Sequence, residues 1–219
     1  GLIGAGKTSL CRVLRDAWGA KLVLEPSENN PFLEPYYEDP VQYALPVQLY
    51  YLMNRWRQQD EIRQQDLFSE TIVSDYLFEK DRLFAEKTLN DVEMEIYDRF
   101  TRVLGEHAPV PDLVILLDVP TEVLMQRIAR RGVPGEWAIE PPYLEDLRQR
   151  YEQMFRSWTR SPLLRIDNQD MNYVDDPDGR RAVLERVEEA IKGSLVPDAP
   201  GSAPDREAKP ELFGARTHQ

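Results

Sequence analysis

Hydrophobic and polar residues follow one another along this chain in two patterns, one typical of helices and one typical of buried strands. Residues 7–18 carry leucine and valine at helical spacing and are followed by Gly19, so we predict a helix that ends at the glycine. Residues 112–118 are almost continuously apolar between two aspartates, as expected of a strand that is covered on both faces.

The same patterns predict further strands and helices. The strand candidates are residues 21–25, 71–75, 112–118 and 163–167, and the later helices are residues 40–65, 79–89, 92–104, 121–131, 143–158 and 180–191. Residues 29–31 are typical of a loop. We expect the helix from residue 40 to bend at Pro46 and to turn one apolar set inward, namely Val41, Leu45, Leu49, Leu52 and Trp56. Strands that alternate with helices predict an α/β fold with a mostly parallel sheet, with ligands at the carboxyl ends of its strands.

Composition and charge narrow the class of partner. The 219 residues, 42% of them hydrophobic, fit a single domain of ordinary size. A net charge of −12 repels polyanions, so we expect no nucleic acid polymer as a partner, whereas a small phosphorylated ligand depends on local cations and backbone amides. Cys11 is the single cysteine, and there is neither a charged-then-apolar leader nor a run of about eighteen apolar residues. We therefore expect a cytoplasmic protein without membrane contact.

The two ends of the chain differ from its middle. The chain begins at Gly1 without a methionine and inside a motif, so we expect the strand that precedes this motif to lie upstream of residue 1. Residues 196–219 are rich in Pro, Gly, Ala and charge and lack an apolar period, which is typical of disorder. We predict one domain over residues 1–195 followed by a disordered tail.

A phosphate-binding motif opens the chain. Residues 1–8 fit G-x-x-x-x-G-K-[ST], in which glycines allow backbone N–H groups to wrap phosphates at a helix N-terminus. We predict that Lys7 pairs with the β- and γ-phosphates of ATP and that Thr8 holds Mg²⁺ through its hydroxyl. The predicted ATP-binding residues are Gly1, Gly4, Ala5, Gly6, Lys7, Thr8 and Ser9.

Two acidic residues end strand candidates and are expected near this loop. Glu25 and Asp75 each follow an apolar strand, so both carboxylates should emerge on the ligand side of the sheet. A kinase uses one acid to accept the proton of the attacking hydroxyl and another to hold the metal. The alternative for either residue alone is a loop cap or a solvated strand end.

Polar residues also mark one helix and one loop. Gln48 and Arg55 lie seven residues apart on an otherwise apolar helix, so they share a face and are able to read a nucleobase edge, unless the stripe is a solvated surface. Arg127, Arg130 and Arg131 precede a Gly- and Pro-containing loop at 132–136. We interpret them as lid arginines that neutralise the transferring phosphoryl group, the alternative being charge that stabilises a helix C-terminus.

Taken in order, residues 1–175 resemble the deoxynucleoside kinase family, especially its bacterial branch that acts on purine or mixed deoxynucleosides. The resemblance is carried by the P-loop, Glu25-Pro26, the segment 30–40, the Gln48 and Arg55 pair, the segment 74–85 and the lid at 127–136 with Tyr143-Leu144. It implies a P-loop kinase three-layer sandwich, in which a central parallel sheet is flanked by helices and an Arg-containing lid. It also implies a homodimer built from the long helices after residues 40 and 90.

The resemblance also implies roles for single residues. Glu25 matches the catalytic base, and Arg127 and Arg131 match the phosphate-facing lid residues. Asp75 matches the metal ligand. The positions that match substrate contacts are Tyr37 for the sugar 3′-hydroxyl, Gln48, Arg55 and Asp81 for the base, Phe84 for stacking and Glu136 for the sugar.

Two departures and two rivals qualify this interpretation. Tyr76 stands where many members have an arginine after the strand-end acid, and Val133 stands where many lids have a second arginine, a charge that Arg130 is placed to supply.

The function implied is transfer of the γ-phosphate of ATP to the 5′-hydroxyl of a deoxynucleoside, with Mg²⁺. The alternatives are a thymidylate-type nucleoside monophosphate kinase, which would need a cation at Tyr76, and a nucleotide-binding switch, which would need no base pocket. The sequence does not rank the bases.

Overall fold

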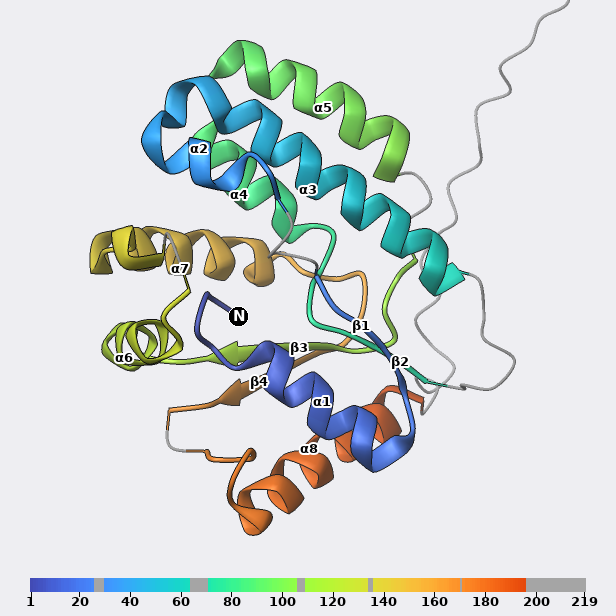
Figure 1. Cartoon of the computed structure of the whole chain (residues 1–219). Helices are drawn as coiled ribbons and strands as arrows, with labels where there is room; N and C mark the ends of the chain where they lie inside the picture. The colour runs from blue at the N-terminus through green and yellow to red at the C-terminus, as the bar shows by residue number, and fades with distance from the viewer. Residues whose placement is uncertain (26–29, 64–70, 106–108, 134–135, 170, 196–219) are drawn as a thin grey trace, which may run out of the picture.

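The computed structural model describes residues 1–25, 30–63, 71–105, 109–133, 136–169 and 171–195 (Figure 1). Its helices are α1 (Lys7–Trp18), α2 (Leu33–Glu38), α3 (Pro40–Arg63), α4 (Lys80–Thr88), α5 (Asp91–Gly105), α6 (Thr121–Arg131), α7 (Pro141–Arg156), α8 (Pro177–Leu195) and the short 3₁₀ helix η2 (Glu136–Ala138). Its strands are β1 (Lys21–Val23), β2 (Ile72–Ser74), β3 (Val114–Asp118) and β4 (Leu163–Asp167). The tail predicted to be disordered and residues 134–135 of the predicted lid loop lie outside the described residues.

The strands form two parallel pairs, flanked by helices. Lys21 of β1 aligns with Ile72 of β2, and Val114 of β3 aligns with Leu163 of β4. In Figure 1, α2 to α5 and α7 lie above the strands, and α1 and α8 lie below them. The α/β class with parallel strands is confirmed, although the described strands form two separate pairs and not one continuous sheet.

Helix α1 has the bounds that the sequence predicts, because a glycine stands at each end. Gly6 precedes it with φ 93°, and Gly19 follows it with φ 64° and donates its N–H to the carbonyl of Arg15 at 2.8 Å. Only glycine adopts such positive φ angles without strain. The apolar face of α1 packs into the core through Leu10 and Leu14.

Two apolar clusters hold the described part of the fold together. The larger cluster joins the P-loop and α1 to β3, β4 and α6 to α8, with residues such as Leu116, Leu124, Leu144, Ile166 and Val183 at its centre. The smaller cluster joins α3, α4 and α5 through Leu52, Ala85 and Tyr97. The helices α3 to α5 therefore form a layer with its own core, placed beside the strand ends.

Helix α3 differs from the prediction in its buried face. Val41 was predicted to face inward but is 82% exposed, because the start of α3 lies at the surface, where its neighbours Pro40 and Gln42 are exposed as well. Leu52 is fully buried as predicted. Helix α2 was not predicted from the sequence. Among the described ranges, no helix is long and apolar enough to cross a membrane.

Candidate active site

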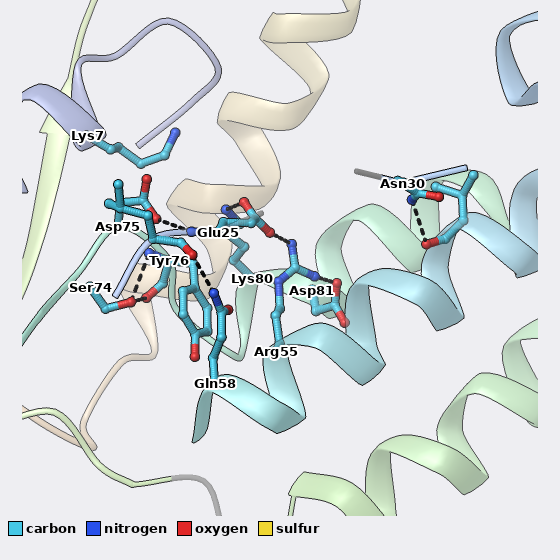
Figure 2. Close-up of polar contacts among 12 residues, drawn as sticks. Lys7, Glu25, Asn30, Arg55, Gln58, Ser74, Asp75, Tyr76, Lys80 and Asp81 are labelled. Atoms are coloured by element: carbon cyan, nitrogen blue, oxygen red, sulfur yellow. Dashed lines mark hydrogen bonds and ion pairs between the residues drawn. The ribbon is translucent and has the colours of Figure 1, made fainter. Parts of the chain in front are cut away.

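The P-loop lies where the carboxyl ends of the strands converge. The hydroxyl of Thr8 donates a hydrogen bond to Oδ2 of Asp75 at 2.6 Å, and Asp75 directly follows β2. Oδ1 of the same carboxylate accepts the backbone N–H of Glu25, after β1, at 2.9 Å (Figure 2). The structure therefore brings the P-loop threonine and both strand-end acids into one cluster, although Thr8 and Asp75 are 67 residues apart in the chain.

The P-loop is held open by glycines and by its own lysine. Gly4 and Gly6 have φ angles of 79° and 93°, and a Cβ on Gly6 would lie 2.5 Å from the hydroxyl of Tyr173. The ammonium of Lys7 donates to the carbonyls of Gly1 and Leu2 at 3.0 and 2.9 Å. Burial and then the charge of Lys80 lower the pKa of Lys7 to about 8.

The other predicted P-loop positions differ in burial. Ala5 is buried, and Ser9 is half-buried in the first turn of α1. Two buried residues that sequence reasoning missed support the loop from the end of β4. Nδ2 of Asn168 donates to the carbonyl of Ala5 at 2.9 Å, and the hydroxyl of Tyr173 donates to the carbonyl of Gly6 at 3.0 Å. These bonds fix the carbonyls of Ala5 and Gly6 where the loop enters α1.

Glu25 is a half-buried acid with a cation on each carboxylate oxygen. Arg55 pairs with Oε1, and the ammonium of Lys80 pairs with Oε2 at 3.1 Å (Figure 2). Burial alone would raise the pKa of Glu25, but the charges and hydrogen bonds of Lys80 and Arg55 outweigh it and lower the pKa to about 2. Glu25 is therefore an anion at neutral pH, fixed beside the P-loop.

Arg55 joins Glu25 to a second acid from α4. Its guanidinium also pairs with Asp81, and the exposed fractions of Arg55 and Asp81 are 4% and 1%. Its guanidinium carbon lies 5.3 Å from the centre of the Tyr51 ring. Gln48, on the same stripe, is buried and donates to the hydroxyl of Thr88 at 3.0 Å. Because both stripe residues are buried, the alternative of a solvated surface stripe is wrong.

The remaining predicted site residues lie outside this cluster. Arg127 donates to the carbonyls of Asn168 and Gln169 at 2.9 and 3.5 Å. Arg131 pairs with Glu136. Burial, and after it the negative charge of Glu136, raise the pKa of the partly exposed Tyr37. Phe84 packs against the larger apolar cluster.

Sequence reasoning also missed three residues of the cluster itself, which are Gln58, Gln59 and Lys80. Gln58 donates to the carbonyl of Leu24, just before Glu25, and Gln59 donates to the hydroxyl of Tyr76 at 3.1 Å. Both glutamines follow Arg55 by three or four residues, so helical spacing places them on its face of α3. That spacing was the available signal for them, whereas nothing in the local pattern marks Lys80.

Comparison with known proteins agrees with this geometry. The sequence model of the deoxynucleoside kinase family matches residues 1–192. Deoxyguanosine kinase of Bacillus subtilis is 29% identical over 196 residues, which cover 87% of this chain and 95% of that protein. Deoxyadenosine kinase of Lactobacillus acidophilus is 29% identical over 206 residues, which cover 88% and 94%.

Solved structures similar to this chain are also deoxynucleoside kinases. The structure of deoxyadenosine kinase from M. mycoides with bound dATP superposes with a TM-score of 0.72 at 25% identity, covering 86% of this chain and 96% of that one. A family match over nearly all described residues is decisive. This chain belongs to the deoxynucleoside kinase family, so it is an ATP-dependent kinase whose acceptors are deoxynucleosides.

Proposed function

We propose that this kinase transfers the γ-phosphate of ATP to the 5′-hydroxyl of a purine deoxynucleoside, or of several deoxynucleosides, for nucleotide salvage. The observation that carries the proposal is the position of Glu25. Its carboxylate is half-buried, ionised and fixed between Arg55 and Lys80, and hydrogen bonds through Asp75 link Glu25 to the P-loop threonine. An acceptor hydroxyl that bonds to Glu25 would lie beside the phosphate cradle.

The transfer itself follows from this placement. The 5′-oxygen forms a bond to the γ-phosphorus, its proton passes to Glu25, and the bond to the β,γ-bridging oxygen breaks, so that ADP leaves. A carboxylate with a pKa of about 2 is a weak base on its own, but the hydroxyl proton becomes acidic as the new bond to phosphorus forms. Catalysis of this kind depends mainly on positioning and charge neutralisation.

We assign the metal site to Thr8 and Asp75. Their oxygens lie 2.6 Å apart at the start of α1, and a hydroxyl with a carboxylate suits a hard cation such as Mg²⁺. The described residues include no group of three or more His, Cys, Asp or Glu side chains that would hold a metal. We propose that the phosphates of ATP supply further ligands to the ion. When bound, Mg²⁺ would neutralise charge on the phosphates.

We propose that the lid arginines act after a change of partner. Arg127 now holds carbonyls at the end of β4, and Arg131 holds Glu136. In the proposed closed state both guanidiniums turn to the transferring phosphoryl group. Glu136 is then released toward the sugar, whose 3′-hydroxyl we assign to Tyr37.

The base pocket is assigned to residues from α3 and α4. Gln48, Arg55 and Asp81 offer buried donors and acceptors at one end of the Glu25 cluster, and Phe84 offers an aromatic ring for stacking. The relatives named deoxyguanosine and deoxyadenosine kinase favour a purine.

We also propose a homodimer through α3 and α5. In Figure 1 these helices form the layer farthest from α1 and α8. Large apolar side chains are exposed on both, namely Val41, Met53, Val92, Ile96, Phe100 and Val103. An apolar surface of this kind suits a symmetric contact with a second copy.

The cytoplasmic location of the protein stays a prediction.

The test is the pair Glu25→Gln and Glu185→Gln, where Glu185 is an exposed glutamate of α8. For Glu25→Gln we expect kcat to fall about a hundredfold or more, with the ATP Kd changed by less than about threefold. Glu185→Gln should match the wild type. An unimpaired Glu25→Gln enzyme would remove Glu25 from the role of proton acceptor.

A further inference from the structure

Lys80 occupies a position that helix stability does not explain. It is the first residue of α4 and only 7% exposed. A buried ammonium loses hydration, and the N-terminal end of a helix repels positive charge. Because both effects disfavour a charged lysine at this position, we expect a nearby acidic partner to stabilise the ammonium.

That partner is Glu25, in the middle of the proposed reaction site. Lys80 Nζ lies 3.1 Å from Oε2, the oxygen that Arg55 does not occupy. Lys80 also lies close to Lys7 of the P-loop. After burial, the positive charge of Lys80 is the largest cause of the lowered pKa of Lys7. Figure 2 draws Lys80 beside Glu25, with Lys7 and Asp75 nearby. Lys80 therefore lies beside the acid and near the phosphate cradle.

The residue after Asp75 brings no charge to this place. Tyr76 is buried and accepts a hydrogen bond from Gln59 of α3 at 3.1 Å. Within the described part of the chain, the cations that pair with Glu25 are Arg55 and Lys80, and Arg55 is shared with Asp81. Among the described residues, Lys80 is thus the cation that forms its ion pair with Glu25 alone.

We propose that Lys80 is a further residue of phosphoryl transfer, which positions Glu25 before the reaction and supplies positive charge to the phosphoryl group during it. This inference rests on the proposed function. When the 5′-hydroxyl proton passes to Glu25, the carboxylate becomes neutral and the ammonium loses its counter-ion. Its charge is released while the 5′-oxygen binds the γ-phosphorus and ADP leaves, which is when negative charge needs stabilisation.

The experiment compares Lys80→Met, Lys80→Arg and Arg82→Met with the wild type. Arg82 lies on the same helix but is exposed and paired with Glu86 and Asp98, so it controls for loss of a cation from α4. For Lys80→Met we expect kcat to fall about a hundredfold to a thousandfold, with the ATP Kd and the deoxynucleoside KM within about threefold. Lys80→Arg should return kcat to within about tenfold of the wild type.

Each other outcome has one meaning. A wild-type enzyme that phosphorylates no deoxynucleoside contradicts the proposed function itself. An active wild type with an equally active Lys80→Met variant overturns the role of Lys80 alone. A loss that Lys80→Arg does not reverse, or that comes with a lower melting temperature and weaker ATP binding, makes Lys80 structural and also overturns it. If Lys80→Met does not fold, Lys80→Gln takes its place with the same criteria.

Discussion

Replacing Arg55 by methionine removes the cation that joins Glu25 to the buried acid Asp81. The guanidinium pairs with Glu25 and Asp81 and is 4% exposed. Glu25 keeps Lys80 as a partner, whereas Asp81 is 1% exposed and loses its ion pair with Arg55. The variant therefore leaves an uncompensated carboxylate in the interior, which is costly because water does not reach it.

The expected loss is about 3 to 5 kcal/mol of unfolding free energy, the usual cost of breaking a buried pair from one side. For a chain of this size that corresponds to a melting temperature lower by about 6 to 20 °C. Urea unfolding followed by the fluorescence of the four tryptophans measures it. Arg55→Met with Asp81→Leu should recover most of the loss, because the unpaired charge is gone.

The matched control is Arg99→Met on α5. Arg99 pairs with Glu95, and these side chains are 75% and 67% exposed, so we expect a change of about 1 kcal/mol or less. If Arg55→Met also stays within about 1 kcal/mol of the wild type at an unchanged m-value, the buried network is not a main contributor to stability and the reasoning is refuted.

Three further predictions concern the P-loop, the cysteine and the dimer. Tyr173→Phe removes the donor to the Gly6 carbonyl and should weaken ATP binding about threefold to tenfold by calorimetry; an unchanged Kd would contradict the support of the loop. Burial raises the pKa of Cys11 to about 12, so iodoacetamide should label it only in urea, and rapid labelling of the native enzyme would count against its burial. Phe100→Glu should give monomers by sedimentation, while Val174→Glu, similarly exposed at 48% against 46%, should remain dimeric; a dimeric Phe100→Glu variant would exclude this face.

Several features of the fold follow from local sequence alone. The bounds of α1 were predictable because Gly6 and Gly19 adopt backbone angles that other residues avoid. The placement of Glu25 and Asp75 near the P-loop was predictable as well, since parallel strands end at the same edge. In each case the signal lies within a few residues, or in a rule of topology.

Other features depend on partners far away in the chain. Lys80 looks like a solvated charge at a helix start, and its burial depends on Glu25, which is 55 residues earlier. Helix α3 buries apolar residues such as Leu52 as predicted, but Arg55 is buried with them because its acidic partners, Glu25 after β1 and Asp81 of α4, come from other parts of the chain. Helix α2 has six residues, includes Pro35 and lacks an apolar period, so no local pattern predicts it.

The most direct test of the central claim is a ³¹P NMR assay of the wild-type protein with MgATP and each deoxynucleoside. The account predicts ADP and a deoxynucleoside 5′-monophosphate in equal amounts, with a purine deoxynucleoside among the acceptors. ADP accompanied only by inorganic phosphate would indicate a nucleotide-hydrolysing switch. Transfer that occurs only when a deoxynucleoside monophosphate is supplied would indicate a monophosphate kinase, and either result would contradict the assignment of Glu25 to the acceptor hydroxyl.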